Sequence, residues 1–308
     1  MLQVSADFKS KNGICEIAET EKRGFEYGVV HWRSKVEGPL LDLLEQSLEL
    51  PKNELLSLLD LGAIYDHQQR LIDSSALTKI CAAGTYLRIH SKPRRFPTDF
   101  EWGQRLIDVR PEFVVVNKPA GIPCHPTVDN LKENLLNTLS GYLGHPLYIT
   151  HRLDVGTSGL IVLAKTKNFQ THFNSMLKTG AVKKNYRTLV DGLPAWAPGT
   201  VFRHWLMPSP RAPKVMSPDP TLGWAECLLK IAHCQSDLTT ARSVVELELL
   251  TGRTHQIRAQ MAALGHPLTG DLIYGGSPSQ NSFSLQSHSL EFEDSGHGRI
   301  YKLSEPLI

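Results

Sequence analysis

Residues 151–160 read His151-Arg152-Leu153-Asp154-Val155-Gly156-Thr157-Ser158-Gly159-Leu160. One carboxylate, Asp154, follows the cation Arg152 and precedes a turn that Gly156 favours. The apolar run at residues 160–164 then predicts a buried strand. These patterns place Asp154 on a loop at the mouth of a pocket rather than in a core. An isolated Arg-x-Asp turn is more typical of local ion pairing, so the rest of the chain has to decide its role.

The segment resembles the catalytic motif of the RluA-type pseudouridine synthases, which reads His-Arg-Leu-Asp, two variable residues and Thr-Ser-Gly-Leu. Three further segments resemble motifs of that family in the order in which the family has them. They are residues 117–126 (NKPAGIPCHP), Lys184-Asn185-Tyr186 with Val190 and Gly192, and residues 251–258 (TGRTHQIR) continuing through 265–271 (GHPLTGD). The resemblance covers roughly residues 110 to 275.

The resemblance implies a catalytic role for Asp154, Tyr186 and Arg258. Uridine isomerisation breaks the bond from C1′ to N1 and reattaches the ring through C5, after the base has left the stack. Asp154 can attack C1′ or C6, or abstract a sugar proton to give a glycal, and the sequence leaves all three routes open. A charged carboxylate is needed in each, and by resemblance Arg258 is its partner. Tyr186 is expected to stack on the base and to move a proton at C5.

RNA is the expected partner, as either tRNA or ribosomal RNA. The RNA-contacting residues expected from the motifs are Arg152, which would hold the flipped conformation, with His151, Lys184, Arg187, Arg253 and His255. The formal net charge of +2 is weak support for this, because RNA-binding surfaces depend on where cations cluster. No obligatory protein partner is expected, and the chain is predicted to be a monomer.

Neither a cofactor nor a metal is expected. No histidine pair has the spacing of a zinc finger or zincin, and no glycine-rich phosphate loop follows a strand. The five cysteines are odd in number and lack Cys-x-x-Cys spacing, which indicates reduced thiols. The first residues lack a basic region followed by an apolar stretch, and no apolar run could span a bilayer, so a cytoplasmic location is predicted.

Two helices followed by strands are predicted before residue 95. Leucines recur at helical spacing in residues 40–48 and 54–60, with Pro51 starting the second helix, and residues 63–66 and 85–89 indicate short strands. This order resembles an S4-type RNA-binding domain. Acidic residues occupy these helices, namely Asp42, Glu45, Glu49, Glu54 and Asp60. The sequence therefore predicts a degenerate S4-like domain, with a structural or docking role at least as well supported as RNA binding.

The remaining elements alternate without βαβ regularity. Strands are predicted at residues 114–116, 186–190 and 243–249, a helix at 167–178 ending at Gly180, and a helix running from an N-cap at Thr254 to Leu264. Residues 193–223 are rich in proline and basic residues and predict a long functional loop or RNA-contacting flap.

Periodicity alone gives an α+β class, and the resemblance implies a pseudouridine synthase catalytic fold with a mixed, mainly antiparallel sheet, preceded by a small S4-like α/β domain. The predicted limits are an N-terminal extension at 1–28, the S4-like domain at 29–95 and the catalytic domain at 96–308.

Two other functions stay open at this point. A non-catalytic RNA-binding or RNA-folding protein on the same fold would be expected to have a defect at Asp154, Tyr186 or Arg258. A glycosidase would need a second carboxylate beside Asp154, and Asp129, Asp191 and Asp271 have no suggestive placement in the sequence.

Overall fold

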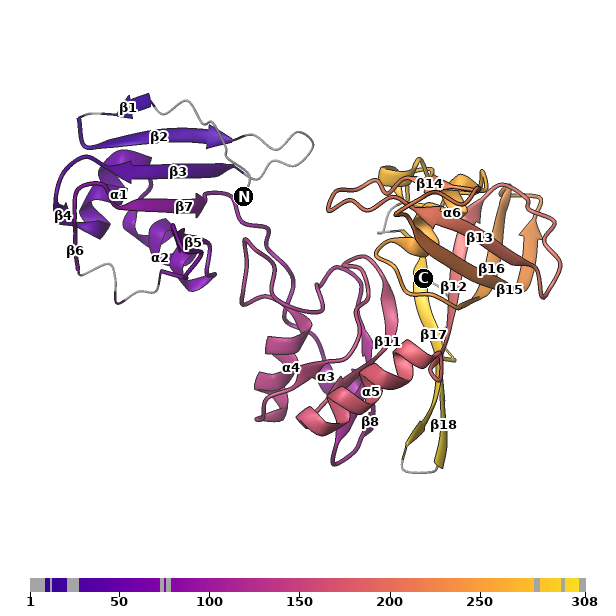
Figure 1. Cartoon of the computed structure of the whole chain (residues 1–308). Helices are drawn as coiled ribbons and strands as arrows, with labels where there is room; N and C mark the ends of the chain where they lie inside the picture. Colours follow the sequence, from indigo (N-terminus) through magenta and orange to yellow (C-terminus); the bar gives the residue numbers. More distant parts are fainter. Residues whose placement is uncertain are drawn as a thin grey trace. The chain divides into compact units, whose positions relative to one another are not determined.

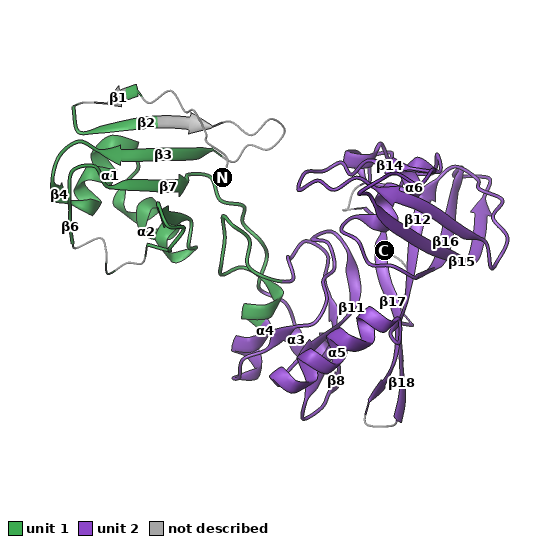
Figure 2. Ribbon diagram, viewed as in Figure 1, with its two compact units in different colours: residues 1–98, 125–138 green, residues 99–124, 139–308 purple. Residues whose placement is uncertain are grey.

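The computed structural model of the chain describes residues 9–11, 13–20, 28–72, 75, 79–279, 283–294 and 297–304. The chain divides into two compact units (Figure 2): residues 1–98 and 125–138 form unit 1, and residues 99–124 and 139–308 form unit 2. Residues 125–138 join unit 1 through specific bonds. The Leu131 N–H donates to the Leu61 carbonyl at 2.7 Å, and Arg94 pairs with Asp129 at 3.0 Å.

In its described residues, unit 1 has a five-stranded antiparallel sheet in the order β1-β2-β3-β7-β5 (Figure 1). The strands are β1 (Lys9–Lys11), β2 (Cys15–Thr20), β3 (Val29–Ser34), β5 (Ile64–Asp66) and β7 (Tyr86–His90). A short pair, β4 (Gly38–Pro39) and β6 (Ile80–Cys81), lies outside it. The two helices are α1 (Leu40–Leu48) and α2 (Lys52–Asp60). The helices and strands predicted before residue 95 are therefore confirmed, with Pro51 as the N-cap of α2.

The core of unit 1 forms because alternate sheet residues and the leucine faces of both helices exclude water together. Trp32 and Leu87 from the sheet pack with Leu44 and Leu55 from the helices, and all four are fully buried. The Trp32 indole N–H donates to the Ser47 hydroxyl at 2.7 Å, which satisfies a buried polar group. The other sheet face does not contribute to this cluster.

Unit 2 is built on one mixed, mainly antiparallel sheet of 11 described strands, so the predicted catalytic-domain fold is confirmed (Figure 1). Its order is β14-β13-β15-β16-β12-β17-β11-β9-β8, with β10 on β11 and β18 on β17. The strands are β8 (Leu106–Val109), β9 (Phe113–Lys118), β10 (Tyr148–Ile149), β11 (Ser158–Ala164), β12 (Lys183–Asp191), β13 (Val201–Leu206), β14 (Met216–Ser217), β15 (Ala225–Asp237), β16 (Arg242–Leu249), β17 (Leu285–Asp294) and β18 (His297–Lys302). The pairing of β11 with β17 is the parallel one among those described.

Several helices accompany this sheet along the chain, and α5 contributes to its core. They are α3 (Trp102–Arg105), α4 (Leu135–Leu143), whose first residues group with unit 1, α5 (Lys167–Thr179) and α6 (Gln256–Ala263), with a 3-10 helix at Leu272–Tyr274. The α5 helix starts with the Thr166 hydroxyl accepting from the Phe169 N–H. It ends at Gly180 in the left-handed conformation, as the sequence predicts. Phe169 and Phe173 of α5 pack on Phe113 and Phe292 of the sheet.

Gly159 is required by the close approach of β11 to β17. Its φ is +104°, and a Cβ atom built on it would lie 2.3 Å from the Ser287 carbonyl oxygen. Any other residue would push the two strands apart. Because Gly159 lies five residues after Asp154, this contact also fixes where the Asp154 loop leaves the sheet.

Two local predictions are wrong. Residues 193–223 are not one long loop, because β13 and β14 lie within them, and β13 pairs with both β14 and β15. The alternative of an RNA-contacting flap in this segment stays a prediction. Thr254 is not the N-cap of α6, because His255 occupies that position with φ +58° and no side-chain capping bond. The helix start is instead organised by Gln256, whose side-chain oxygen accepts from the Arg253 N–H at 3.0 Å and the Thr251 hydroxyl at 2.9 Å.

The domain limits 1–28, 29–95 and 96–308, and the S4-like character of the first domain, stay predictions. Parts of 1–28 lie outside the described residues, and β2 pairs with β3 in the sheet of unit 1. Within the described part of the chain, no helix combines the length and apolar character needed to cross a membrane.

Candidate active site

The loop that carries Asp154 is tied to the turn after β9 by a buried ammonium group. Lys118 is fully buried, and its Nζ donates to the carbonyls of Pro119, Ile122 and Val155 at 2.9, 2.9 and 3.2 Å. The Gly121 N–H also donates to Val155 O at 2.8 Å. Burial lowers the pKa of Lys118 to about 8. The turn after β9 and the Asp154 loop are therefore held as one piece.

Within that loop, Asp154 lies at the start of a tight turn. The Thr157 N–H donates to the Asp154 carbonyl at 3.0 Å, which closes the turn as predicted. On the other side, the neighbouring Leu153 exchanges two contacts of 3.2 Å with the Cys124 thiol. The Asp154 side chain keeps 23% of its surface exposed. Its backbone is fixed while its carboxylate stays accessible.

Arg258, on α6, lies between two carboxylates. Its Nε and Nη2 donate to the two oxygens of Asp271 at 2.6 and 2.8 Å, a bidentate pair. Its Nη1 lies 3.4 Å from Oδ2 of Asp154. The exposed side-chain fractions are 5% for Arg258 and 1% for Asp271. Burial alone would lower the pKa of Arg258, but the Asp271 and Asp154 carboxylates raise it above the ordinary value, so the guanidinium stays charged.

Aromatic rings and the left-handed residue His255 complete the surroundings of Arg258. The guanidinium carbon lies 4.2 Å from the centre of the Phe283 ring and 5.0 Å from that of Tyr274. His255 faces Tyr274 with Nδ1, 3.1 Å from the hydroxyl oxygen, and Asp154 with Nε2, 3.9 Å from Oδ2. Burial lowers the pKa of His255, which favours the neutral imidazole.

Tyr186, on β12, is buried, and its ring sits where the pairing of β12 with β17 shifts register. Burial first, and then the negative charge of Asp154, raise its pKa, so the phenol stays protonated. The fold therefore brings Arg258, His255 and Tyr186 close enough to Asp154 to interact electrostatically with its carboxylate.

Two of the residues expected to contact RNA have protein partners. The Nε2 atom of His151 accepts from the Val162 N–H at 3.2 Å, and the ring stacks on Phe173. Burial and the positive charge of Lys184 lower the pKa of His151. Arg187 donates to Glu246 at 2.7 and 3.0 Å. Since successive strand residues point to opposite faces, Arg187 and Tyr186 project from opposite faces of β12.

The other expected RNA contacts are placed differently. Arg152 and Arg253 are exposed, and the Arg253 guanidinium makes no ion pair with a described residue. Burial lowers the pKa of Lys184, which lies near the loop that contains Gly252. The roles of all these residues stay predictions.

Sequence reasoning missed Asp271 and Lys118 as parts of this site. The sequence-based predictions include Asp271 only as a second carboxylate for glycosidase chemistry, and its bond to Arg258 joins positions 13 residues apart. Lys118 belongs to a segment that the family resemblance had already singled out. Both residues lie in segments that resemble family motifs, and this could have marked them as parts of the site. A motif does not, however, indicate which atoms a side chain will bond.

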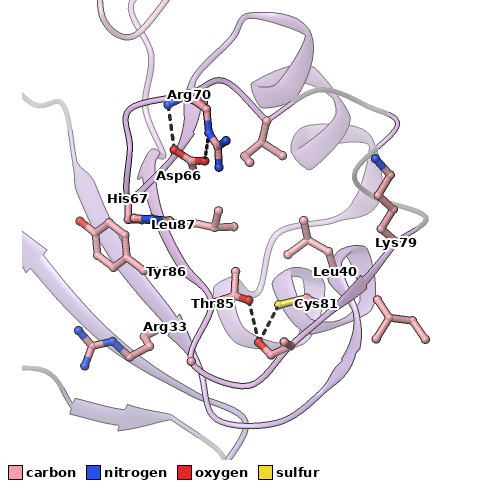
Figure 3. A pocket seen from close by; sticks show the side chains of 14 residues that line it. Arg33, Leu40, Asp66, His67, Arg70, Lys79, Cys81, Thr85, Tyr86 and Leu87 are labelled. Carbon is pink, nitrogen blue, oxygen red and sulfur yellow. Dashed lines mark hydrogen bonds and ion pairs between the residues drawn. The ribbon is translucent and has the colours of Figure 1, made fainter.

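The described residues hold no cluster of three or more histidine, cysteine or acidic side chains that could bind a metal ion. A cavity of about 730 Å³ lies in unit 1, lined by residues such as Leu40, Cys81 and Leu87 (Figure 3). All the residues discussed above as the candidate site belong to unit 2. The site offers an accessible carboxylate, a fixed cation beside it and a buried phenol, which suits carboxylate-dependent chemistry on a small planar group.

Comparisons with known proteins give a consistent result. The family described as RNA pseudouridylate synthase matches residues 112–263. The chloroplastic RNA pseudouridine synthase 6 of Oryza sativa subsp. japonica is 35% identical over 242 residues, which are 69% of this chain and 50% of that protein. An uncharacterized RNA pseudouridine synthase of Mycobacterium bovis is 30% identical over 236 residues, which are 68% of this chain and 71% of that protein.

Among solved structures, human RNA pseudouridylate synthase domain containing 1 is similar with a TM-score of 0.55 and 25% identity, over 65% of this chain and 83% of the human one. The chain spans about half the length of the curated plant relatives that it matches.

Proposed function

Because the chain belongs to the RNA pseudouridylate synthase family, and within it to the RluA type, we propose that it isomerises uridines in RNA to pseudouridines, with Asp154 as the catalytic carboxylate. The observation that carries this proposal is the arrangement of Arg258. Its guanidinium is clamped by Asp271 and presents its remaining nitrogen to Asp154 at 3.4 Å. A fixed cation beside an accessible carboxylate holds that carboxylate in one orientation without further reorganisation.

The reaction exchanges one bond of the uracil ring for another. The bond from C1′ to N1 breaks, a bond from C1′ to C5 forms, C5 loses its proton and N1 takes one up, so the product is an isomer and no oxidant or cofactor is consumed. Attack of Asp154 on C1′ or C6, and proton abstraction toward a glycal, each need the ionised carboxylate. All three routes stay open. The uridine must first leave the base stack to come within reach of Asp154.

Arg258 and Tyr186 have separate proposed roles. Arg258 orients the Asp154 carboxylate and stabilises negative charge there. Tyr186 provides a buried ring on which a flipped uracil can stack, and its protonated hydroxyl can donate or relay a proton near C5. We assign Asp271 a positioning role, because it touches Arg258 rather than the substrate.

The proposed RNA-contacting residues are the six predicted from the sequence, and their exposure and protein partners indicate how readily each could reach RNA. Arg152 and Arg253 are exposed and able to meet phosphates, and His255 faces the carboxylate. Lys184 is partly buried, His151 bonds the backbone of β11, and Arg187 pairs with Glu246. Contact by the last two requires those bonds to open when RNA binds.

The proposal also covers the substrate RNA, the oligomeric state and the cellular compartment. The substrate is tRNA or ribosomal RNA, since a loop-presented uridine is what a base-flipping site can take. The chain acts as a monomer without an obligatory protein partner, and without cofactor or metal. The five cysteines are free thiols, which fits a reducing compartment such as the cytoplasm.

The test replaces the carboxylate with its amide. RNA with tritium at C5 of uridine releases the label to water when C5 forms its new bond, so label release measures turnover. With the RNA that pseudouridine mapping identifies as substrate, Asp154→Asn should bind with unchanged affinity and release no tritium. Asp237→Asn, a turn aspartate of β15 whose carboxylate caps local groups, is the matched control and should retain full turnover.

Turnover by Asp154→Asn would refute the assignment of Asp154. A chain that binds RNA but releases no tritium from any cellular RNA, even as wild type, would favour the non-catalytic alternative.

A further inference from the structure

The sheet of unit 1 has a second face, opposite α1 and α2, that the proposed function does not use. Along β3 and β7 the inward residues Trp32 and Leu87 belong to the core, and the residues between them point the other way. Of the acidic residues that make RNA binding by the helices unfavourable, Asp42, Glu45, Glu54 and Asp60 lie on α1 and α2, and Glu49 directly follows α1. The opposite face has a different chemistry.

Aromatic and cationic side chains alternate on this outer sheet face, which we define by His31, Arg33, Tyr65, Tyr86 and Arg88. Arg33 lies directly opposite Tyr86 in the pairing of β3 with β7, and His31 lies opposite Arg88. Tyr65 on β5 lies opposite Arg88 on its other side. Figure 3 shows Tyr86 and Arg33 on one side of the strand and Leu87 on the other. Strand pairing thus places Arg33 beside Tyr86 on β3 and β7, and sets His31, Arg88 and Tyr65 in one row across β3, β7 and β5.

The rings of the outer sheet face are held in place and remain accessible. The His31 ring nitrogen Nδ1 and the Tyr86 hydroxyl lie 2.5 Å apart, and the Tyr65 hydroxyl donates to the Val128 carbonyl at 2.9 Å. His31, Tyr65 and Tyr86 are each partly exposed. Fixed rings lose little conformational entropy when another ring stacks on them.

The charges on the outer sheet face favour an anionic partner. The side chains of Arg33 and Lys35 lie 3.9 and 3.4 Å from the Glu16 carboxylate, and Arg88 adds a further cation. Arg88 is partly exposed and makes no ion pair with a described residue, so no described carboxylate neutralises its charge.

From these observations we infer that the outer sheet face binds single-stranded RNA, with bases stacked on Tyr86 and Tyr65 and phosphates held by Arg33 and Arg88. A sheet with fixed aromatic rings and neighbouring arginines is a general solution for single strands, because every base has a face to stack and every linkage a phosphate. A duplex hides its base faces and an acidic peptide has none, so neither uses the rings. This contact is separate from the isomerisation site and does not require catalysis.

Binding is measured by fluorescence anisotropy with a labelled oligouridylate of about 12 nucleotides, within the range that such surfaces cover. The full chain carries Asp154→Asn throughout to prevent turnover. Tyr86→Ala should weaken binding about tenfold, the effect of losing one stacked base. Tyr86→Phe keeps the stacking ring but loses the hydroxyl contact with His31, so it should bind more tightly than Tyr86→Ala.

Cation variants test the phosphate contacts. Arg33→Gln and Arg88→Gln should each lower the slope of log K against log salt by about 0.7. Lys52→Gln removes an exposed cation at the start of α2, on the helical side, and is the matched control that should leave the slope unchanged.

Photocrosslinking makes the test independent of variants that fold poorly. Oligouridylate with 4-thiouridine, in excess over the full chain, should crosslink to peptides that contain Tyr86 or Tyr65. Crosslinks confined to residues 99–124 and 139–308, or unchanged binding by both Tyr86→Ala and Arg33→Gln, would overturn the inference. So would equal competition by an oligoglutamate of the same charge, because the face would then be a general anion surface. Loss of catalysis in Asp154→Asn affects none of these outcomes.

Discussion

The candidate active site of unit 2 and the outer sheet face of unit 1 both combine arginines with aromatic rings, but they differ in how the cations are held. Arg258 is buried, bound to Asp271 through two hydrogen bonds and flanked by Phe283 and Tyr274. Arg88 is partly exposed and makes no ion pair with a described residue. One guanidinium is fixed by the protein, and the other is available to a ligand.

The difference follows from what each site has to do. A carboxylate that reacts with one atom of a substrate needs a partner that does not move, since preorganised charge stabilises a transition state without reorganisation. A surface that binds a flexible strand gains more from cations that can adjust to phosphate positions. We therefore expect Arg258 to matter for both stability and turnover, and Arg88 to matter for binding alone.

The strongest test of this comparison is removal of Arg258. Arg258→Met leaves Asp271 as a buried, unpaired carboxylate, so the free energy of unfolding should fall by about 3–5 kcal/mol and turnover should be lost. The double variant Arg258→Met with Asp271→Leu removes both charges and should recover most of the stability in urea titrations. It should stay inactive, because nothing then orients Asp154.

Arg88→Met is the matched control in unit 1. It removes a cation without stranding a buried carboxylate, so the free energy of unfolding should change by less than about 1 kcal/mol. If Arg88→Met lowered the free energy of unfolding as much as Arg258→Met does, Arg88 would be held by the protein as firmly as Arg258, and the comparison would fail.

Lys118 sharpens the comparison, because it is a fixed cation held by carbonyls rather than by a carboxylate. Its pKa in the folded chain is about 8, below the ordinary value of 10.5 for lysine. Between these values the unfolded chain binds more protons than the folded chain, so this group makes stability rise with pH. The stabilisation that Lys118 gains from deprotonation is absent below pH 8, grows between pH 8 and pH 10.5 and is complete above pH 10.5.

The measurement is urea unfolding from pH 7 to 11 for the wild type and Lys118→Met. The difference in free energy of unfolding, wild type minus variant, should grow by about 3 kcal/mol across the window. The difference isolates Lys118 from other lysines and tyrosines that titrate there. A constant difference would mean that Lys118 keeps an ordinary pKa, and that its three carbonyl bonds compensate fully for burial.

Much of this fold could be predicted from local patterns. The apolar run at 160–164 and the helix at 167–178 follow from periodicity and caps, and both elements are present as β11 and α5. The strand β13 was missed because its sequence, Val201–Leu206, mixes charged, polar and apolar residues within a proline-rich segment. Its pairing with β15 depends on the sheet as a whole, which no local window contains.

The site was predicted in part, for a similar reason. The family resemblance predicts that Arg258 partners Asp154, and the structure brings them to 3.4 Å, while their catalytic roles stay predictions. Asp271 in a Gly-Asp turn gives no local sign that it clamps Arg258. The sequence likewise offers a histidine beside Arg152 as an RNA contact, but only packing reveals that His151 bonds the Val162 N–H.

The smallest expected effect separates two exposed or partly exposed arginines within unit 2. Both Arg187 and Arg253 are expected from the motifs to contact RNA, but Arg187 already pairs with Glu246 at 2.7 Å and Arg253 makes no ion pair with a described residue. Arg253→Gln should lower the slope of log K against log salt by about 0.7 to 1, the contribution of one phosphate contact. Arg187→Gln should leave the slope unchanged and alter stability by at most about 1 kcal/mol, because partly exposed ion pairs contribute little. Titrations with substrate RNA at several salt concentrations measure both. Equal slopes for the two variants would mean that RNA displaces Glu246 from Arg187, and that an existing ion pair does not distinguish a fixed cation from an available one.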